Sequence, residues 1–140
     1  MPTITIDTPA LRPAQRRAVA VRLTRWLVRR GVQAAHVVVR FVDTPEGSVF
    51  SGGMPLEALP AGTSPIRHAS VICCVGPDRD EEFQAALAAE IGEALGANED
   101  TPFLYVEFRP TRPSHVYLLR QGRWCRADEA AVPNEGETPR

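Results

Sequence analysis

The feature that most constrains the fold of this chain is a strand–helix–strand pattern that occurs twice. Alternating apolar and polar residues indicate a strand, and apolar residues at a spacing of three to four indicate a helix. The first occurrence covers residues 3–7, 13–30 and 36–42. The second covers residues 69–75, 79–95 and 103–108. The sequence therefore predicts two βαβ units in one chain.

Two such units are expected to form an α/β (α+β) fold with a single four-stranded sheet. Because crossovers between parallel strands are right-handed, both helices are expected on one face of that sheet. Residues 36–42 are so apolar that we expect this strand to be covered on both faces, as in a parallel sheet. The opposite face of the sheet is expected to be bare and apolar, and we predict that other subunits cover it.

The remaining segments connect or extend the two units. We expect one domain over residues 1–126, followed by a flexible tail at 127–140 that is rich in proline and acidic residues. Within the domain we expect a βαβ unit at 2–42, a connector at 43–68, a second βαβ unit at 69–110, and a C-terminal hairpin or extension at 111–126.

The amino-acid composition excludes lysine-dependent chemistry and argues against nucleic-acid binding. All 16 basic residues are arginine, so a lysine Schiff base and a P-loop lysine are excluded. The net charge of −1 argues against general nucleic-acid binding. Eight of the arginines lie in residues 1–40, where the only acidic residue is Asp7. A basic patch near the first helix fits a small anionic partner better than a polyanion.

Metal sites, membranes and secretion are not expected. The three cysteines include the adjacent pair Cys73 and Cys74, whose side chains point to opposite faces of a strand and cannot share one ion. The histidines lack metal-ligand spacing, and we expect no cofactor. No stretch approaches the ~20 apolar residues of a membrane helix. The first residues lack the features of a signal peptide, so a cytoplasmic location is expected.

The residue that points most directly to chemistry is Pro2. If Met1 is removed, Pro2 carries a free secondary amine at the start of the first strand. An α-amino group has an ordinary pKa of about 7.7–8.0, and burial disfavours its charged form. A buried proline amine is therefore expected to act as a general base near neutral pH.

With these residues in place, the chain resembles the tautomerase superfamily, whose members place an amino-terminal proline on duplicated βαβ units. The superfamily includes 4-oxalocrotonate tautomerase (4-OT), malonate semialdehyde decarboxylase and macrophage migration inhibitory factor (MIF). The sequence most resembles the cis-3-chloroacrylic acid dehalogenase group. The resemblance covers residues 2–124. It rests on Met1-Pro2, on residues 13–20 and 45–53, and on the elements of the second half.

The resemblance implies roles for individual residues. Pro2 matches the catalytic proline, and Tyr105 matches a tyrosine that orients water or substrate. Arg12 and Arg79 match arginines that bind a substrate carboxylate, and His115 is expected to contact substrate. From the residues alone, alternatives remain open: Arg12 can be a solvated loop arginine, Arg79 a first-turn helix residue, and His115 a surface histidine.

The chain also departs from the dehalogenase pattern. The second carboxylate-binding arginine, the histidine and the glutamate of that group fall at Gly76, Leu27 and Val116. We therefore predict a homotrimeric tautomerase that interconverts keto and enol forms of a small unsaturated or 2-oxo carboxylic acid. The alternatives are a decarboxylase, hydratase or dehalogenase of the same superfamily, or a non-catalytic paralogue.

Overall fold

The computed structural model describes residues 2–129 of the chain. The helices and strands of the two main units are β1 (Thr3–Thr8), α1 (Pro13–Val28), β2 (Val38–Asp43), β5 (His68–Val75), α2 (Glu81–Leu95) and β6 (Phe103–Pro110). Shorter elements connect and extend them: η1 (Ala34–His36), β3 (Phe50–Ser51), β4 (Met54–Pro55), η2 (Leu56–Ala58), η3 (Pro113–His115), β7 (Tyr117–Arg120) and β8 (Arg123–Arg126).

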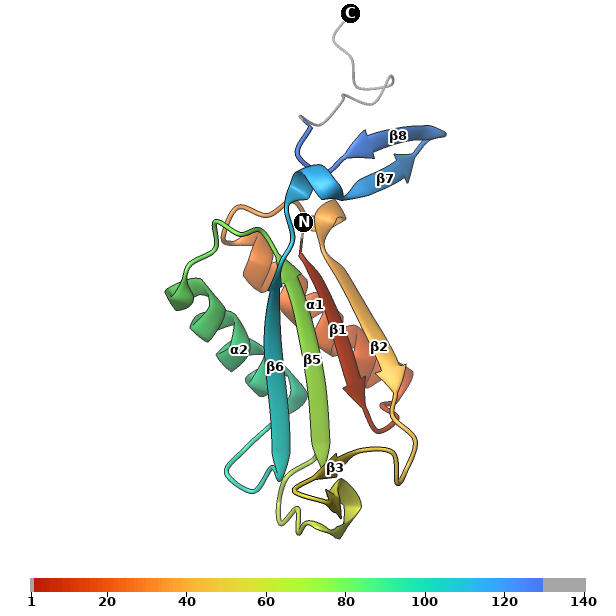
Figure 1. Cartoon of the computed structure of the whole chain (residues 1–140), viewed down its shortest axis with the longest axis vertical. Helices are drawn as coiled ribbons and strands as arrows, with labels where there is room; N and C mark the ends of the chain where they lie inside the picture. Colours follow the sequence, from red (N-terminus) through yellow and green to blue (C-terminus); the bar gives the residue numbers. More distant parts are fainter. Residues whose placement is uncertain (1, 130–140) are drawn as a thin grey trace, which may run out of the picture.

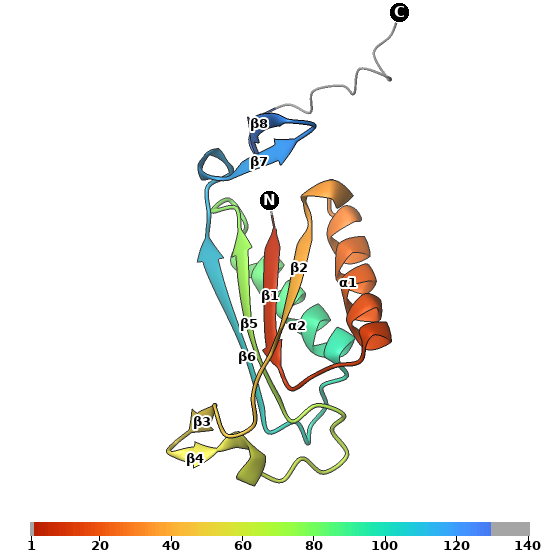
Figure 2. The same cartoon turned by 90° about the vertical axis from the view of Figure 1, so that its right-hand side faces the viewer.

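The four long strands form one mixed sheet in the order β2-β1-β5-β6. Each unit is a parallel pair, β1 with β2 and β5 with β6, and the two units join through the antiparallel pair β1–β5. Both helices lie on the same face of the sheet (Figures 1 and 2). The predicted fold class is therefore confirmed, and the antiparallel junction runs the two units in opposite directions.

The core lies between the sheet and the two helices. On β1 the side chains of Ile4 and Ile6 point toward the helices and are fully buried, because successive residues of a strand face opposite ways. The helices present their own fully buried side chains to this layer: Leu23, Leu27, Leu87 and Ile91. Burying a side chain of this size contributes about 1.5–3 kcal/mol to folding.

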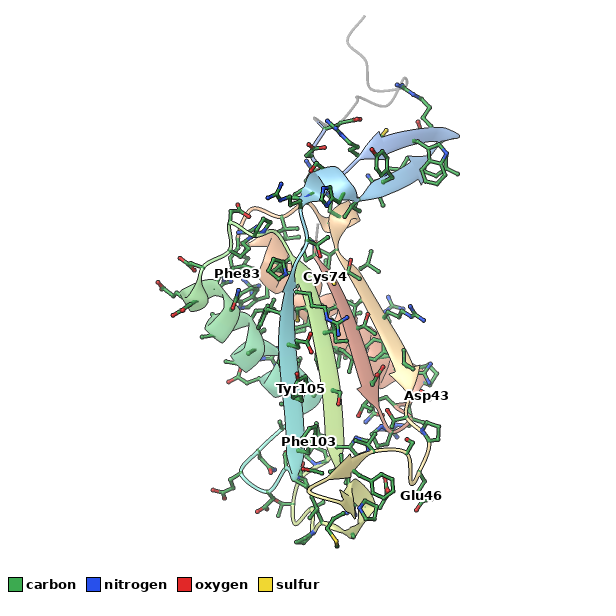
Figure 3. The ribbon with its side chains drawn as sticks, in the orientation of Figure 1. Asp43, Glu46, Cys74, Phe83, Phe103 and Tyr105 are labelled. Carbon is green, nitrogen blue, oxygen red and sulfur yellow. The ribbon has the colours of Figure 1, made fainter. Side chains whose placement is uncertain are left out.

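The open face of the sheet differs from the expectation of a bare apolar surface. It carries Thr3 and Thr5 from β1 and Tyr105 and Glu107 from β6, which are half-buried or exposed. Figure 3 shows Tyr105 on this face. Apolar side chains share this face, since Val38, Ile72 and Phe103 follow the same alternation on β2, β5 and β6. The open face is therefore mixed, and the prediction of an apolar face holds only in part. In the single chain the open face of β2 is not covered as predicted, since Val38 is 41% exposed. β2 is also an edge strand of the sheet.

The observed helix boundaries differ from the predicted ones by two residues. α1 ends at Val28, two residues before the predicted end. α2 begins at Glu81, and its N-cap is Asp80, whose side chain accepts a hydrogen bond from the Phe83 backbone N–H at 2.9 Å. Asp80 thereby satisfies one of the free N–H groups of the first turn, so the helix begins two residues after the predicted start at residue 79.

The connector folds against one end of the sheet. It forms the short β3–β4 hairpin and η2, and its Leu56 is fully buried. His68, the first residue of β5, is only 1% exposed, and its carbonyl accepts a hydrogen bond from the Thr8 hydroxyl at 2.7 Å. His68 thus belongs to the sheet and not to the predicted connector.

At the other end of the sheet the C-terminal hairpin β7–β8 projects beyond the strands (Figures 1 and 2). Most of the predicted tail at 127–140 lies outside the described residues. In the part of the chain that the structure covers, neither helix is long and apolar enough to cross a membrane.

Candidate active site

Pro2 is buried at the end of the sheet from which β1 starts. Its carbonyl accepts a hydrogen bond from the Val38 backbone N–H at 3.1 Å. The next residue, Thr3, pairs with Val38 on one side and with Cys74 on the other. Pro2 therefore lies between the start of β2 and the end of β5, at the start of one of the two central strands.

Several chain segments converge on this end of the sheet. β5 and β6 both end here, and the Thr111 N–H, just after β6, donates to the Val75 carbonyl at 2.8 Å. η1 enters β2 from here, and η3 follows β6 into the hairpin (Figure 1). This end therefore combines the buried proline with loops whose side chains are accessible.

Arg79 lies in the loop between β5 and α2, at the same end of the sheet as Pro2. Its guanidinium lies 4.6 Å from the centre of the Phe83 ring, and Phe83 in turn lies 5.5 Å from Trp26. The guanidinium is therefore held against the helical layer by a cation–π contact.

His115 also lies at this end, as the last residue of η3, and its side chain is exposed. Within the single chain, the structure therefore brings Pro2, Arg79 and His115 to the same end of the sheet. It leaves the other two predicted site residues elsewhere.

Arg12 lies at the opposite end of β1. It is the N-cap residue of α1, and its backbone N–H donates to the Gln15 side chain at 2.9 Å. Since a strand rises about 3.3 Å per residue, the six residues of β1 separate Pro2 from the start of this loop by about 20 Å.

Tyr105 lies on the open face of β6, in register with Ser70 of β5 and Asp7 of β1 (Figure 3). Asp7 is five residues along β1 from Pro2, so Tyr105 is about 16 Å from Pro2 along the strand direction. Within the single chain, Tyr105 therefore does not reach the proline.

Tyr105 is part of a hydrogen-bonded row along β6. Its hydroxyl donates to Glu107 at 3.0 Å, and Arg109 Nε donates to the same carboxylate at 2.6 Å. The hydrogen bonds from Arg109 and Tyr105 lower the pKa of Glu107, and the bond to Glu107 raises the pKa of Tyr105. The row therefore holds a charged carboxylate beside a neutral phenol.

Two residues near Pro2 were not singled out by the sequence analysis. Arg120 of β7 donates through Nη2 to the Ala35 carbonyl in η1 at 2.9 Å. His36, the next residue of η1, is half-buried, and its pKa is lowered by burial and by the neighbouring Arg120 charge. The contact between β7 and η1 joins residues 85 positions apart, so no local spacing in the sequence announces it.

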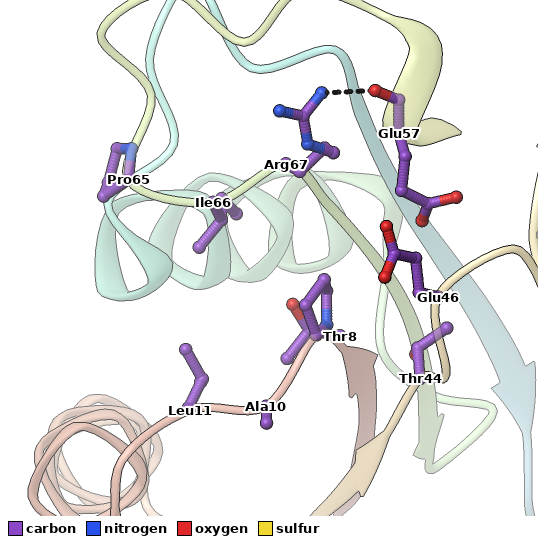
Figure 4. Close-up of a pocket in the computed structure, with 10 residues that line it drawn as sticks. Thr8, Ala10, Leu11, Thr44, Glu46, Glu57, Pro65, Ile66 and Arg67 are labelled. Atoms are coloured by element: carbon purple, nitrogen blue, oxygen red, sulfur yellow. Dashed lines mark hydrogen bonds between the residues drawn. The ribbon is translucent and has the colours of Figure 1, made fainter. Parts of the chain in front are cut away.

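A cavity of about 400 Å³ lies at the opposite end of the sheet, between the end of β1 and the connector. Figure 4 shows its lining, which includes Leu11, Glu46 and Ile66. Arg67 borders it and donates to the Glu57 carbonyl at 3.0 Å. Among residues 2–129, no cluster of three or more histidine, cysteine or acidic side chains could hold a metal ion.

A comparison with known protein families finds no match to this sequence, and a comparison with curated protein sequences finds none either. Solved structures do match in fold. A native fused 4-OT superposes with a TM-score of 0.64 at 18% identity, covering 86% of this chain and 94% of that one. A member of the cis-3-chloroacrylic acid dehalogenase family, N1, gives a TM-score of 0.64 at 17% identity, with coverage of 86% and 81%.

Macrophage migration inhibitory factor from Toxoplasma gondii gives a TM-score of 0.61 at 19% identity, covering 88% of this chain and 99% of that one. The chain therefore has the fold of the tautomerase superfamily. The resemblance stated from sequence is confirmed at this level. The narrower likeness to the dehalogenase group stays a prediction, because a fused 4-OT aligns equally well.

Proposed function

We propose that this protein is a tautomerase-type enzyme whose base is the amino group of Pro2. The observation that carries this proposal is a buried proline directly before the first residue of a central strand, in a fold shared with 4-OT and MIF structures. The substrate is a small unsaturated or 2-oxo carboxylic acid, and the reaction interconverts its keto and enol forms. A cytoplasmic location is part of the same proposal.

The chemistry follows from the properties of a secondary amine. Burial and nearby guanidinium groups both disfavour the protonated form, which lowers the pKa of such an amine. In the keto form, the neutral nitrogen removes a proton from the carbon next to the carbonyl. In the enol form, it removes the proton from the enol oxygen. The protonated nitrogen then returns that proton elsewhere on the conjugated system. A cation near the developing enolate stabilises it, and no cofactor is needed for these steps.

The substrate class is supported by charge and by one related structure. Arg79 and Arg120 both lie near the Pro2 end of the sheet, and guanidinium groups bind carboxylates with two parallel hydrogen bonds. Pt0534, which has this fold at a TM-score of 0.59 and 16% identity, is inactivated by 2-oxo-3-pentynoate. That inactivator is itself a 2-oxo carboxylate.

We further propose a homotrimer. Structures of fused 4-OT with this fold are described as asymmetric and symmetric trimers. The hairpin of this chain exposes Tyr117, Leu119 and Trp124 on one face, and an isolated two-stranded hairpin is marginally stable in water. Assembly would cover that face. It would also allow Arg12 and Tyr105 of one protomer to approach Pro2 of another.

The first experiment asks whether the amine exists. Intact-mass measurement of the purified chain is expected to show that Met1 is absent. A chain that keeps Met1 has an amide at Pro2, which has no basic lone pair, and this result would refute proline catalysis and favour a non-catalytic paralogue.

The second experiment asks what the amine does. Ketonisation of phenylenolpyruvate is expected to fall roughly a hundredfold in the Pro2→Ala variant, the lower end of what a general base contributes. Turnover of 3-haloacrylates or of malonate semialdehyde, in place of ketonisation, would favour the hydratase, dehalogenase or decarboxylase alternative. Equal rates for Pro2→Ala and the unmodified chain would refute all the proposed activities that depend on this proline.

Labelling with 2-oxo-3-pentynoate tests the amine directly. The nitrogen lone pair forms a bond to the alkyne carbon that bears the methyl group, and the proton of the amine moves to the neighbouring carbon. Peptide mapping is expected to find one label per chain, on Pro2. A label on another residue would contradict the proposal.

A further inference from the structure

The Pro2 end of the sheet contains several guanidinium groups, and they differ in how free they are to bind a ligand. Arg79 is held over the Phe83 ring on the helical side. Arg109 is bound to Glu107 at 2.6 Å on the open face. Neither side chain is directed toward Pro2 by a contact that the structure shows.

Arg120 is placed differently. Its Nη2 donates to the Ala35 carbonyl at 2.9 Å, which fixes the side chain to η1. η1 ends at His36, two residues before Val38, whose N–H bonds to the Pro2 carbonyl at 3.1 Å. The hairpin that carries Arg120 stands directly beyond the start of β1 (Figures 1 and 2).

The Arg120 side chain also retains binding capacity. A guanidinium has five N–H donors, and the bond to Ala35 uses one of them. Within residues 2–129, no acidic side chain forms an ion pair with it, and its side chain is exposed. His36 beside it has a pKa lowered by burial and by the Arg120 charge, so it is neutral near pH 7. Arg120 is therefore a fixed positive charge with free donors beside η1, the segment that leads into β2 next to Pro2.

We propose that Arg120, supplied by the C-terminal hairpin, binds the carboxylate of the substrate at the Pro2 site. This inference rests on the proposed function for the identity of the substrate, and it assigns the carboxylate-binding role within the protomer to Arg120 and not to Arg12 or Arg79. The hairpin then has a second role besides assembly, because it completes the binding site.

The test measures equilibrium binding, which does not require turnover. Isothermal titration of the unmodified protein with phenylpyruvate is expected to give a Kd that rises roughly tenfold to a hundredfold in Arg120→Ala, the range for a lost hydrogen-bonded charge pair. Arg120→Lys is expected to fall between the two, since it keeps the charge and loses the paired donors. The matched control is Arg123→Ala, which removes the cross-strand partner of Arg120 and is expected to change Kd less than twofold.

A second ligand separates carboxylate binding from a loosened hairpin. The methyl ester of phenylpyruvate lacks the negative charge, so its affinity is expected to be the same for the unmodified protein and for Arg120→Ala. Equal losses for acid and ester would assign Arg120 a structural role and overturn the inference. So would no binding of phenylpyruvate to the unmodified protein, or an unchanged Kd in Arg120→Ala.

The outcome is independent of the test of Pro2. If Pro2→Ala keeps full activity while Arg120→Ala loses phenylpyruvate affinity, the proposed base is wrong and the carboxylate site remains. If Pro2→Ala is inactive and Arg120→Ala binds normally, the base remains and the carboxylate site lies elsewhere.

Discussion

Two glycines that follow the helices offer a matched test of packing between the second helix and the connector. Gly31 follows α1 and has φ +89°, and Gly96 follows α2 and has φ +78°. Both occupy the left-handed region in which only glycine is free of Cβ strain. A Cβ on Gly31 would meet nothing within 4 Å, whereas a Cβ on Gly96 would lie 2.9 Å from Cγ of Pro65.

The magnitudes follow from these two environments. Gly31→Ala is expected to destabilise the fold by about 1–2 kcal/mol, the strain of one left-handed residue. Gly96→Ala carries the same strain and also presses on a rigid proline ring, and overpacking of this kind adds about 1–3 kcal/mol. In a Pro65→Ala background the Cγ atom is gone, so the additional loss in Gly96→Ala should disappear.

The assay is urea unfolding followed by circular dichroism, with all variants at the same protein concentration so that the proposed assembly would contribute equally to each stability. An unchanged m value would show that the variants differ in stability and not in the surface exposed on unfolding. Equal free energies of unfolding for Gly31→Ala and Gly96→Ala would refute the reasoning. So would an additional loss in Gly96→Ala that persists in the Pro65→Ala background.

Two further predictions concern buried titratable groups. Burial lowers the pKa of His68, so the unfolded state binds more protons between that lowered pKa and about 6.5, and stability should fall as the pH drops through this window. His68→Gln should reduce the loss between about pH 7.5 and pH 5, whereas the exposed-residue control His115→Gln should retain it; identical slopes would contradict the role of His68. Burial raises the pKa of the Cys73 thiol to about 12, so iodoacetamide should alkylate half-buried Cys74 in the native protein and reach Cys73 only on unfolding. Peptide mapping that finds Cys73 modified in the native protein would count against this.

Much of the fold follows from local patterns. The alternation around Ile4 and Ile6 predicts a strand with one buried face, and the helical spacing around Leu23 predicts an amphipathic helix, because each pattern reports which side chains must leave water. Whether the open face of the sheet is covered could not be predicted from local patterns. The apolar run 36–42 suggested a strand covered on both sides, yet β2 is an edge strand, and its position depends on sheet order.

Some residues of the candidate site could likewise be inferred from the sequence, and others could not. Pro2 could be proposed from the sequence because its expected chemistry depends on one residue and its place in the chain, and its role stays a prediction. Arg120 and His36 were not, because the hairpin returns to η1 across 85 positions without any motif that records the contact. The distances from Pro2 to Arg12 and Tyr105 also follow from strand register, which the sequence does not report.

Because β1 and β5 are antiparallel, each half of the molecule starts its central strand at a different end of the sheet. The two starts have the same place in their βαβ units but different residues. Each half starts a central strand, and the residue immediately before that strand is Pro2 in the first half and Arg67 in the second. Arg67 lies inside the polypeptide, so its nitrogen is a peptide amide whose lone pair is delocalised and not basic. Internal repetition thus reproduces the architecture but not the base, and each chain has room for one proline-dependent centre. The cavity that Arg67 borders lies at the start of β5, as the Pro2 site lies at the start of β1, but it contains no amine from the start of a chain.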